Sequence, residues 1–482
     1  MSDDRFTAHL PGHTGRVLMA AFLDGPDHLA SAAADGTVRL WSSTEQRQLA
    51  EVRVDAPLHC AAYDPTTGHV VVGSAAGTVH PPTEPREGSP HTMTQPAPAP
   101  VVVSNVAGSF AWGVLHDRHP TLIERVRQAT HYPLEQQRAL DTLLQEIAED
   151  GVILPLPDTE PGADQWQEWG KEHIGSRWGD VPFLWAESYF YRKLLAALGY
   201  FAPGPWQGID PFAPFKNAEL AGPTVEAELA ALDQRPQIPA VEQDCTLLHA
   251  SLWGNRADLG FAVSAGDAGL GHRVTDLVAD NSAVLWEALS ASPPGKVCLV
   301  ADNAGPELLP DLVLADHLLH TDRAACVVLH LKPYPYYVSD ATATDTLACL
   351  HRLTTAPGYA SEIGKRLQQA LTTGRLTLRA HPFSCAPFPY ADMPADLHED
   401  FATATLTIMK GDLNYRRLVG DQHWSATTPF TDVTSYFPGP VAALRTLKSD
   451  VITGLAPQTL HELEVTGPQW RTSGTHALIQ VT

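Results

Sequence analysis

The sequence predicts an α/β protein: a three-layer α/β/α sandwich around a mostly parallel sheet, with a helical subdomain before it and a small all-β fragment at the N-terminus. Three observations predict this arrangement. From residue 245 onward, short apolar runs alternate with helical stretches, which is typical of a parallel sheet with helices on both faces. Residues 107–203 carry apolar side chains at helical spacing. Residues 8–80 contain strand-like runs joined by turn residues.

The all-β fragment comes first along the chain. Gly12-His13 precedes two apolar runs, Asp35-Gly36 supplies a turn between two strands, and Trp41 closes the unit. These residues resemble one WD40 blade. The run that begins at Ala76 repeats the one that begins at Asp35 after 76 − 35 = 41 positions, inside the period of roughly 40 to 45 for such blades. The fragment is therefore predicted to hold two partial WD40-like repeats.

Two blades are fewer than the roughly four to eight of a closed propeller, so they cannot bury their own faces. Two interpretations stay open: a piece that binds a protein partner, or a remnant without a role. A Pro-rich segment follows and is expected to act as a linker, because it cannot form a packed core. The predicted organisation is a WD40-like fragment, a linker, a helical subdomain and an α/β core, at residues 8–80, 81–104, 105–240 and 241–482.

Composition limits the partners and the compartment. The chain has 482 residues, 44% of them hydrophobic, which is enough for two or three folding units. Its net charge of −23 repels phosphodiester backbones, so we expect no nucleic-acid partner. No apolar stretch approaches the roughly 18 residues of a membrane span, and residues 1–5 have neither a basic lead nor an apolar core for export. We therefore expect no membrane association and a cytoplasmic location.

Several apolar runs of the predicted core are expected to form strands. The clearest are Val297–Ala301, Cys326–Leu331 and Thr405–Met409, and Thr246–Leu248 is a shorter candidate. A helix is expected over Glu307–Leu319 because its apolar residues recur at helical spacing. In sheets of this kind, ligands bind in the crevice beyond the carboxyl ends of the strands. The polar residues just after these runs are therefore the candidates for chemistry.

Acidic and amide side chains follow two of the runs. Asp302 and Asn303 come after the first, and Asp340 lies in the segment that follows the second, so we expect the three to converge. Their hard oxygen atoms suit magnesium or manganese and leave open positions for water and substrate. The alternative is that each caps a helix, since Asp and Asn are favoured at helix N-termini.

Further candidates lie beside the other strand ends. Asp412 and Asn414 follow the third run, although turns containing Asn are ordinary. Arg445 and Lys448 lie three residues apart on a segment predicted to be helical, where they would share one face. They are either a clamp for an anion or a solvated basic edge, and Lys332 offers the same choice.

Taken together, these motifs resemble the damage-control phosphatases of the DUF89 family, in the branch marked by an Arg-Thr-x-Lys motif. The resemblance covers about residues 105–480. Two departures are minor: Pro306 replaces the aromatic residue usual after Ala-Gly, and Tyr336 stands where a Trp is common. The motifs that carry the resemblance are Asp302-Asn303-Ala304-Gly305, Lys332-Pro333, Val338-Ser339-Asp340, Gly411 to Arg416, Arg445 to Lys448, Ser251 to Asn255 and Glu187 to Arg192.

The resemblance implies a metal-dependent phosphatase that hydrolyses small phosphorylated metabolites, typically sugar phosphates such as fructose phosphates. Carried over by motif, the residues that hold a divalent metal (Mn, Co, Ni or Mg) and act in catalysis would be Asp302, Asn303 and Asp340. The residues that bind substrate would be Asp302, Asn303, Gly411, Asp412, Leu413, Asn414, Tyr415 and Lys448. The family pattern does not include the WD40-like fragment.

Two alternatives to a phosphatase remain. This branch of the family is also associated with methyl transfer from S-adenosylmethionine to protein glutamates. The chain lacks a glycine-rich adenosyl loop after an early strand, and its Asp-Asn-Asp set favours the phosphatase. The other alternative is a non-enzymatic scaffold in which the WD40-like fragment recruits partners.

Overall fold

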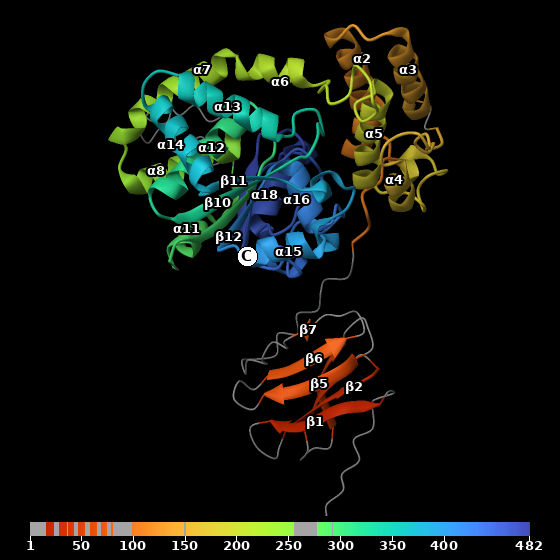
Figure 1. Ribbon diagram of the computed structural model, residues 1–482, viewed down its shortest axis with the longest axis vertical. Coiled ribbons are helices and arrows are strands. Elements are labelled where there is room, and N and C mark those ends of the chain that lie inside the picture. Colours follow the sequence, from red (N-terminus) through yellow and green to blue (C-terminus); the bar gives the residue numbers. More distant parts are fainter. Residues whose placement is uncertain are drawn as a thin grey trace, which may run out of the picture. The chain divides into compact units, whose positions relative to one another are not determined.

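The computed structural model describes two compact units, Met1–Thr92 and Met93–Thr482, and each is treated by itself (Figure 1). The motif Gly12-His13, the repeat at residues 76–78 and the linker residues 81–98 lie outside the described residues. The described residues are 16–23, 28–35, 37–42, 47–53, 58–64, 69–74, 79–80, 99–148, 151–254, 277–291 and 293–482.

The N-terminal unit contains two antiparallel sheets, as predicted. The first is a four-stranded meander of β1 to β4, and the second joins β5 to β7. In the first sheet, buried Trp41 donates its indole N–H to the Ser31 hydroxyl at 2.7 Å, which satisfies the ring nitrogen inside the sheet packing. Whether this unit binds a partner stays a prediction. The strands are Val17–Leu23, His28–Ala33, Thr37–Ser42, Arg47–Arg53, Leu58–Asp64, His69–Ser74 and Val79–His80.

The second unit is built on a seven-stranded sheet in the order β11-β10-β9-β12-β13-β14-β8. The first five strands in that order are mutually parallel, β14 is antiparallel to β13, and β8 runs with β14. The predicted mostly parallel sheet is therefore confirmed. Its strands are β8 (Leu277–Asp280), β9 (Gly295–Val300), β10 (Ala324–Leu331), β11 (Leu376–Ala380), β12 (Leu406–Lys410), β13 (Val441–Thr446) and β14 (Ala477–Val481).

Helices cover both faces of this sheet, which completes the three layers. Along β9, Val297 and Leu299 pack into the cluster formed with α8, α11, α12, α13 and α14, while Cys298 and Val300 pack into the cluster formed with α15, α16 and α17. This alternation explains why the strand reads as an unbroken apolar run. The helices are Ala240–Trp253, Ser282–Ser290, Leu308–His320, Ala343–Thr355 and Tyr359–Thr373 on one face, and Ala395–Ala402, Gly411–Val419 and Phe430–Val433 on the other; α18 (Pro457–Val465) follows.

The helices between Phe110 and Gln237 form the lobe that Figure 1 shows beside the sheet, with α6 and α7 running across toward α8. The centre of the lobe is α5, which is almost wholly buried. Residues 99–104, assigned above to the end of the linker, hydrogen-bond to Asp421, Gln422 and Gly179. The elements are α1 (Phe110–Gly113), the π-helix η1 (Val114–Arg118), α2 (His119–Ala129), α3 (Leu134–Ala148), α4 (Ala163–Trp169), η2 (Trp178–Asp180), α5 (Phe183–Leu198), α6 (Ala213–Leu220), α7 (Pro223–Ala231) and η3 (Leu232–Gln237).

Two local predictions were wrong. Thr246–Leu248 belongs to α8 and not to a strand, because a short apolar run cannot distinguish a strand from a buried helix. Arg445 and Thr446 end strand β13 and do not lie on a helix, so Arg445 points into the interior while Lys448 is exposed.

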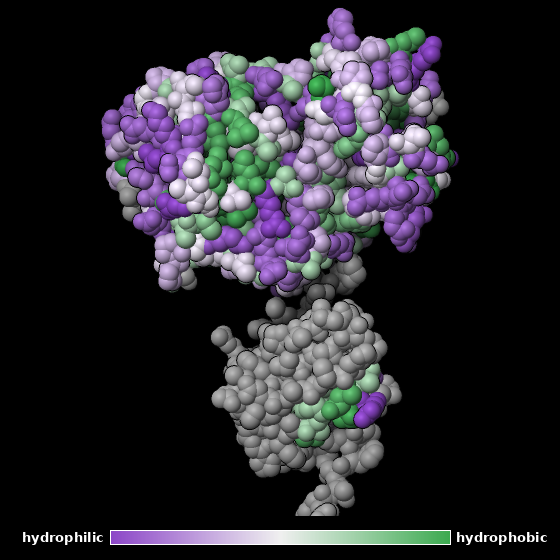
Figure 2. Space-filling model, viewed as in Figure 1, coloured by the Kyte–Doolittle hydropathy of each residue, from purple (hydrophilic) through white to green (hydrophobic). Residues whose placement is uncertain are grey.

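The surface of this unit is mixed. Figure 2 shows hydrophilic residues over most of its visible face, interrupted by an apolar strip in the region where α13 lies in Figure 1. Within the ranges described, no helix is both long and apolar enough to cross a membrane.

Candidate active site

The candidate site lies at the carboxyl ends of three adjacent strands. Strand β9 pairs in parallel with β10 on one side and β12 on the other, so all three end at the same edge of the sheet. Asp302 follows β9, the segment that holds Asp340 follows β10, and Gly411 follows β12. The structure thus brings together the candidates that the strand ends had indicated.

Backbone hydrogen bonds join the two acidic segments directly. The amide of Ala341 donates to the carbonyl of Asp302 at 2.8 Å, and the amide of Ala304 donates to the carbonyl of Ser339 at 2.7 Å. The Ser339 hydroxyl also donates to Oδ1 of Asn303 at 2.7 Å. These bonds form a short bridge between Asn303 and Asp340 and hold all three candidate ligands in one place.

Neither acidic segment caps a helix. Helix α12 begins after Glu307, which makes no capping side-chain bond. Helix α13 is capped by Thr342 and Asp345, whose side chains each bond the other's backbone amide. The capping alternative for Asp302 and Asp340 is therefore wrong, and their burial needs another explanation.

The segment before Asp340 is strained. Tyr337 and Val338 have φ angles of 44° and 68°, in the left-handed region that a β-branched residue such as valine rarely adopts. Contacts hold the segment in this shape, since Tyr336 donates its hydroxyl to Ser188 at 2.6 Å. Strain of this kind persists where surrounding structure enforces it and is concentrated at functional sites.

The two carboxyl groups are costly to ionise in this position. Burial raises the pKa of Asp302 well above its usual value, and the negative charges of Glu307 and Asp340 raise it further. Burial likewise raises the pKa of Asp340 to about 6, although Lys332 lies 3.3 Å from Oδ2 and opposes the shift. This Oδ2 atom is buried and makes no hydrogen bond to any described residue. A cation between the two carboxylates would relieve both effects.

Gly411 allows the N-terminus of α16 to approach Asp302. Its φ angle is +84°, and a Cβ atom at this position would lie 1.9 Å from Oδ2 of Asp302. Any side chain at position 411 would therefore displace the carboxylate. The free amides of the first helical turn point toward the same end of the sheet, where they favour an anion.

Asp412 and Asn414 are engaged within the protein. Oδ1 of Asp412 accepts bonds from Arg445 at 2.8 Å, from the Ser449 hydroxyl at 3.0 Å and from the Lys448 amide at 3.3 Å. The amide nitrogen of Asn414 donates to the carbonyls of Ala301 and Lys410 at 3.0 and 2.8 Å. Asp412 thus holds the loop that carries Lys448, and Asn414 holds the ends of β9 and β12.

The other predicted substrate residues differ in exposure. Leu413 is buried against the helical lobe, and the Tyr415 hydroxyl bonds Thr453 and Gln480 inside the core. Lys448 has a side chain 46% exposed, and its Nζ lies 3.8 Å from Oε1 of Glu307. Among these residues, Lys448 is therefore the side chain best placed to meet a ligand from solvent.

Sequence reasoning missed several charged groups near the site. Lys216, from α6, pairs with Asp210 and Asp345 at 2.9 Å each and lies 3.5 Å from the carbonyl of Asp340. Lys410 pairs with Asp311 at 3.0 Å inside the core. Asp311 had a detectable signal, since it is a charged residue inside a mostly apolar helical run. The position of Lys216 beside the site had none, because Asp340 and Asp345 lie 124 and 129 residues away in sequence.

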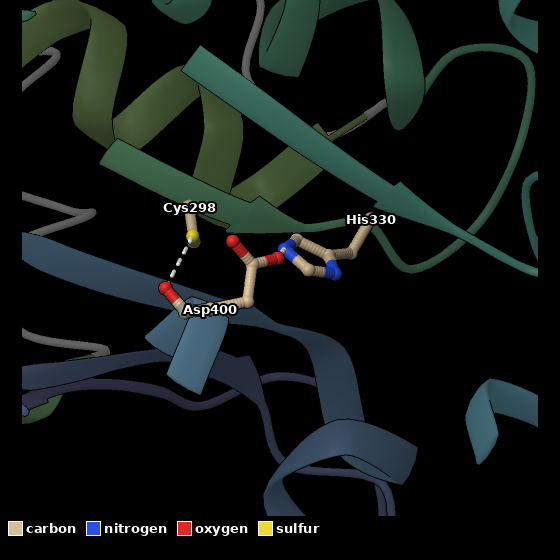
Figure 3. A group of neighbouring side chains, drawn as sticks. All are labelled: Cys298, His330 and Asp400. Atoms are coloured by element: carbon tan, nitrogen blue, oxygen red, sulfur yellow. Dashed lines mark hydrogen bonds and ion pairs between the residues drawn. The ribbon is translucent and has the colours of Figure 1, made fainter. Parts of the chain in front are cut away.

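A second group of potential metal ligands, Cys298, His330 and Asp400, lies between β9, β10 and α15 (Figure 3). Here Asp400 already pairs with Lys296 at 2.6 Å and with Arg379 at 2.7 Å. Burial raises the pKa of the Cys298 thiol to about 12, which disfavours the thiolate that binds metal. Two cations thus neutralise the only carboxylate, and the group fits a structural ion-pair cluster better than a metal site.

A cavity of about 690 Å³ lies elsewhere. It is lined by α3, α5 and the loops around Pro155 and Trp206, and none of the candidate residues lines it. Its charged residues Lys193 and Glu146 neutralise each other at 2.6 Å. It offers no group for phosphate chemistry.

Comparison with known proteins identifies the family of this chain. Residues 114–463, which include all the candidate residues, match the family model of the damage-control phosphatase ARMT1-like domain. The chain belongs to the ARMT1-like damage-control phosphatase family. Residues 4–42 match the model of the WD domain, G-beta repeat.

The family assignment extends to named relatives. The damage-control phosphatase ARMT1 of Danio rerio is 30% identical over 433 residues, which span 77% of this chain and 94% of that protein. The ARMT1 of Mus musculus is 30% identical over 427 residues, spanning 77% and 96%. A crystal structure of a DUF89 family protein from Pyrococcus horikoshii matches with a TM-score of 0.37 and 16% identity, covering 72% of this chain and 94% of that chain. The resemblance to DUF89 damage-control phosphatases stated from the motifs is confirmed by the family match.

Proposed function

We propose that this ARMT1-like protein is a metal-dependent phosphatase that hydrolyses phosphate monoesters of small metabolites, with sugar phosphates such as fructose phosphates as its substrates. The observation that carries the proposal is the pair of buried carboxyl groups, Asp302 and Asp340, at the carboxyl edge of the sheet. Neither caps a helix, and burial raises the pKa of both. Burying two carboxyl groups side by side is costly, and perturbed carboxyl groups of this kind are concentrated at functional sites, so we assign the pair a chemical role.

Asp302, Asn303 and Asp340 fit a hard divalent cation such as manganese, cobalt, nickel or magnesium. They offer oxygen donors, and the buried Oδ2 of Asp340 has only the ammonium group of Lys332, at 3.3 Å, as a charged neighbour among the described ion pairs. Asn303 is oriented by the Ser339 hydroxyl, as ligand amides often are by outer groups. When bound, such an ion supplies positive charge to neutralise phosphoryl oxygens and to activate water.

The phosphate group would be bound from the opposite side by Lys448 and the first turn of α16. Lys448 is an exposed point charge, and Asp412 fixes its backbone amide. The positive end of the helix adds free amide donors. Gly411 lets these donors come close to Asp302.

Hydrolysis forms a bond from an oxygen nucleophile to phosphorus and breaks the bond from phosphorus to the ester oxygen, which leaves with a proton. Direct attack by water fits the arrangement, and so does attack by a carboxylate of Asp302 or Asp340, after which water would cleave the aspartyl phosphate and release inorganic phosphate. In either route the charged groups act by positioning and by electrostatic stabilisation of the phosphoryl oxygens.

Phosphate release from a panel of sugar phosphates tests the proposal. The purified full-length protein is assayed with manganese, cobalt, nickel or magnesium, beside Asp302→Ala and a control, Asp141→Asn. Asp141 is an acid on α3 whose side chain is 55% exposed and pairs with Arg127. We expect metal-dependent release that EDTA and Asp302→Ala abolish and that Asp141→Asn leaves unchanged.

Absence of release with every metal would reject the proposal. Release that survives Asp302→Ala would place the chemistry elsewhere. An adenosyl analogue added to the same assay distinguishes phosphate hydrolysis from methyl transfer. A phosphatase should release phosphate at the same rate with and without the analogue.

A further inference from the structure

Arg118 occupies an unusual backbone position. It is the last residue of the π-helix Val114–Arg118, which joins α1 to α2. Such π-helical turns are rare in proteins and occur frequently at functional sites. A side chain at this turn points in a different direction from one on a regular helix. The turn therefore makes the side chain of Arg118 a candidate for a functional role.

The turn is anchored to the loop of the candidate site through aromatic contacts. His119, the next residue, is buried and stacks on Phe190 with ring centroids 3.7 Å apart. It also meets the edge of Tyr191 at 5.9 Å, and Tyr191 stacks on Tyr337 at 4.7 Å. Tyr337 lies in the strained segment just before Asp340. The backbone at Arg118 is therefore fixed relative to the candidate metal ligands.

The guanidinium group of Arg118 is unpaired among the described residues. The residue is exposed, and no hydrogen bond or ion pair of its side chain occurs within the part of the chain that the structure describes. The interior arginines behave differently: Arg416 pairs with Glu187 and Asp421, and Arg445 pairs with Asp412. An arginine held in place but left unpaired is available to an anion from solvent.

The charge of Arg118 acts on residues of both halves of the site. Burial raises the pKa of Glu187 on α5, and the positive charge of Arg118 opposes this shift. The negative charge of Glu187 in turn raises the pKa of Asp340. Arg118 also counteracts Glu307, Asp302 and Asp412, which together raise the pKa of Lys448. Two neighbouring cations repel each other unless an anion lies between them.

We propose that Arg118 is the second cation of the phosphate site, so that the phosphoryl group is bound between Lys448 of the α/β core and Arg118 of the helical lobe. The inference rests on the proposed phosphatase function and adds to it a residue that directly contacts the substrate. The planar guanidinium presents two parallel N–H donors that match two phosphate oxygens, whereas Lys448 acts as a point charge. Substrate binding then links the two parts of this unit.

Binding of inorganic phosphate, the reaction product, tests the role of Arg118 without requiring turnover. Calorimetry on full-length protein with manganese compares wild type, Arg118→Gln and Arg138→Gln. Arg138 is the matched control, because it is an exposed arginine of α3 in the same helical lobe. We expect Arg118→Gln to weaken phosphate binding by roughly tenfold to a hundredfold, as for loss of a charge-assisted bond, and Arg138→Gln to change it less than twofold.

A conservative variant distinguishes the loss of a phosphate contact from a folding defect. Arg118→Lys keeps the charge but loses the paired donors, so we expect an intermediate loss of affinity with an unchanged melting temperature. In the phosphatase assay, the same variants should raise KM more than they lower kcat, because the contact already exists in the bound ground state. A merely structural role would instead lower the melting temperature and affect both charge-keeping and charge-removing variants alike.

The outcomes distinguish the two proposals. If wild-type protein releases and binds phosphate and Arg118→Gln binds it equally well, the role of Arg118 is rejected and the phosphatase stands. If wild-type protein neither releases nor binds phosphate, both fall. Weakened binding in Arg118→Gln alone supports the inference.

Discussion

Asp302 and Gly411 come from neighbouring strands and lie so close that a Cβ atom on Gly411 would fall 1.9 Å from Oδ2 of Asp302. The carboxylate therefore fills the volume that any other residue at position 411 would occupy. This contact joins the proposed metal ligand to the helix end that we assign to phosphate. Even the methyl group of an alanine at position 411 should therefore disturb the site.

Gly411→Ala should abolish phosphate release while leaving the fold in place. The added methyl group must push Asp302 away from Asn303 and Asp340, so we expect a loss of at least about a hundredfold in kcat/KM, as misplacement by about 1 Å can cause. Steady-state kinetics measure this loss, and manganese titration should show weaker binding.

Gly374→Ala is the matched control for this change. Gly374 has a φ angle of +74°, similar to that of Gly411, but a Cβ atom there meets nothing within 4 Å. Both alanines carry the backbone cost of about 1 to 2 kcal/mol for a left-handed residue, and only one disturbs Asp302. Equal activity in the two variants would refute the importance of the contact.

Metal affinity should decline in mildly acidic solution. Metal binding requires ionised carboxylates, and burial raises the pKa of Asp340 to about 6 in the metal-free protein. Below this pH a proton must leave for each carboxylate that binds, so we expect manganese affinity to fall about tenfold per pH unit for each proton displaced. Calorimetry in buffers of different ionisation enthalpy measures the protons released.

Asp340→Asn separates the two contributions. This variant should bind manganese more weakly at pH 7.5 and show a shallower decline between pH 6 and pH 5, because one titrating group is gone. A pH dependence identical to that of wild-type protein would assign the protons to other groups.

The placement of Asp302, Asn303 and Asp340 could be predicted from the sequence for a simple geometric reason. Each follows an apolar run long enough for one buried strand, and parallel strands end at the same edge of a sheet. The fold class followed from the same alternation of strands and helices. Local pattern therefore sufficed for candidate residues that follow the ends of strands.

The supporting contacts could not be predicted in this way. Lys216 reaches the backbone of Asp340 across 124 residues, and Arg118 comes from a π-helical turn that no periodicity indicates. The segment Arg445–Lys448 was misread as a helix because two cations three residues apart fit a helical face as well as the end of a strand. Tertiary packing decides such cases.

Asn414 should prove important for stability as well as activity. Its side-chain amide donates to the carbonyls of Ala301 and Lys410, and its Oδ1 accepts from the Tyr390 hydroxyl at 3.2 Å. Asn414→Ala leaves the two buried carbonyls without these bonds, which should cost about 2 kcal/mol of unfolding free energy. Urea denaturation measures the loss.

Tyr390→Phe provides the control for Asn414, since it removes one bond and leaves both carbonyls satisfied. We expect a smaller loss, on the order of 1 kcal/mol or less, and near-normal phosphate release. If Asn414→Ala instead raised KM without lowering stability, the substrate contact expected from the family motif would be the better account of this residue.

Asp400 should stabilise the fold in a manner that depends on pH. The imidazole of His330, with Nε2 3.3 Å from Oδ2, and the ammonium group of Lys296 hold the pKa of this carboxyl below its usual range. Because the folded-state pKa is depressed, the stabilisation is fully present above the unfolded value of about 3.9 and is lost as the pH falls through the lower folded value. Asp400→Asn should therefore be less stable than wild type by on the order of 2 kcal/mol at pH 7, with the difference shrinking below pH 4.

Asp396→Asn is the control on the same helix, because Asp396 has a side chain that is 61% exposed and pairs with His381 at the surface. Its effect on stability should be small at every pH. Addition of zinc should leave the melting temperature of wild-type protein unchanged, since Lys296 and Arg379 already occupy the carboxylate of Asp400 and the Cys298 thiol stays protonated. Stoichiometric zinc binding that Asp400→Asn or Cys298→Ser removes would show instead that a metal displaces these cations, and the cluster would then be a second metal site beside β9 and β10.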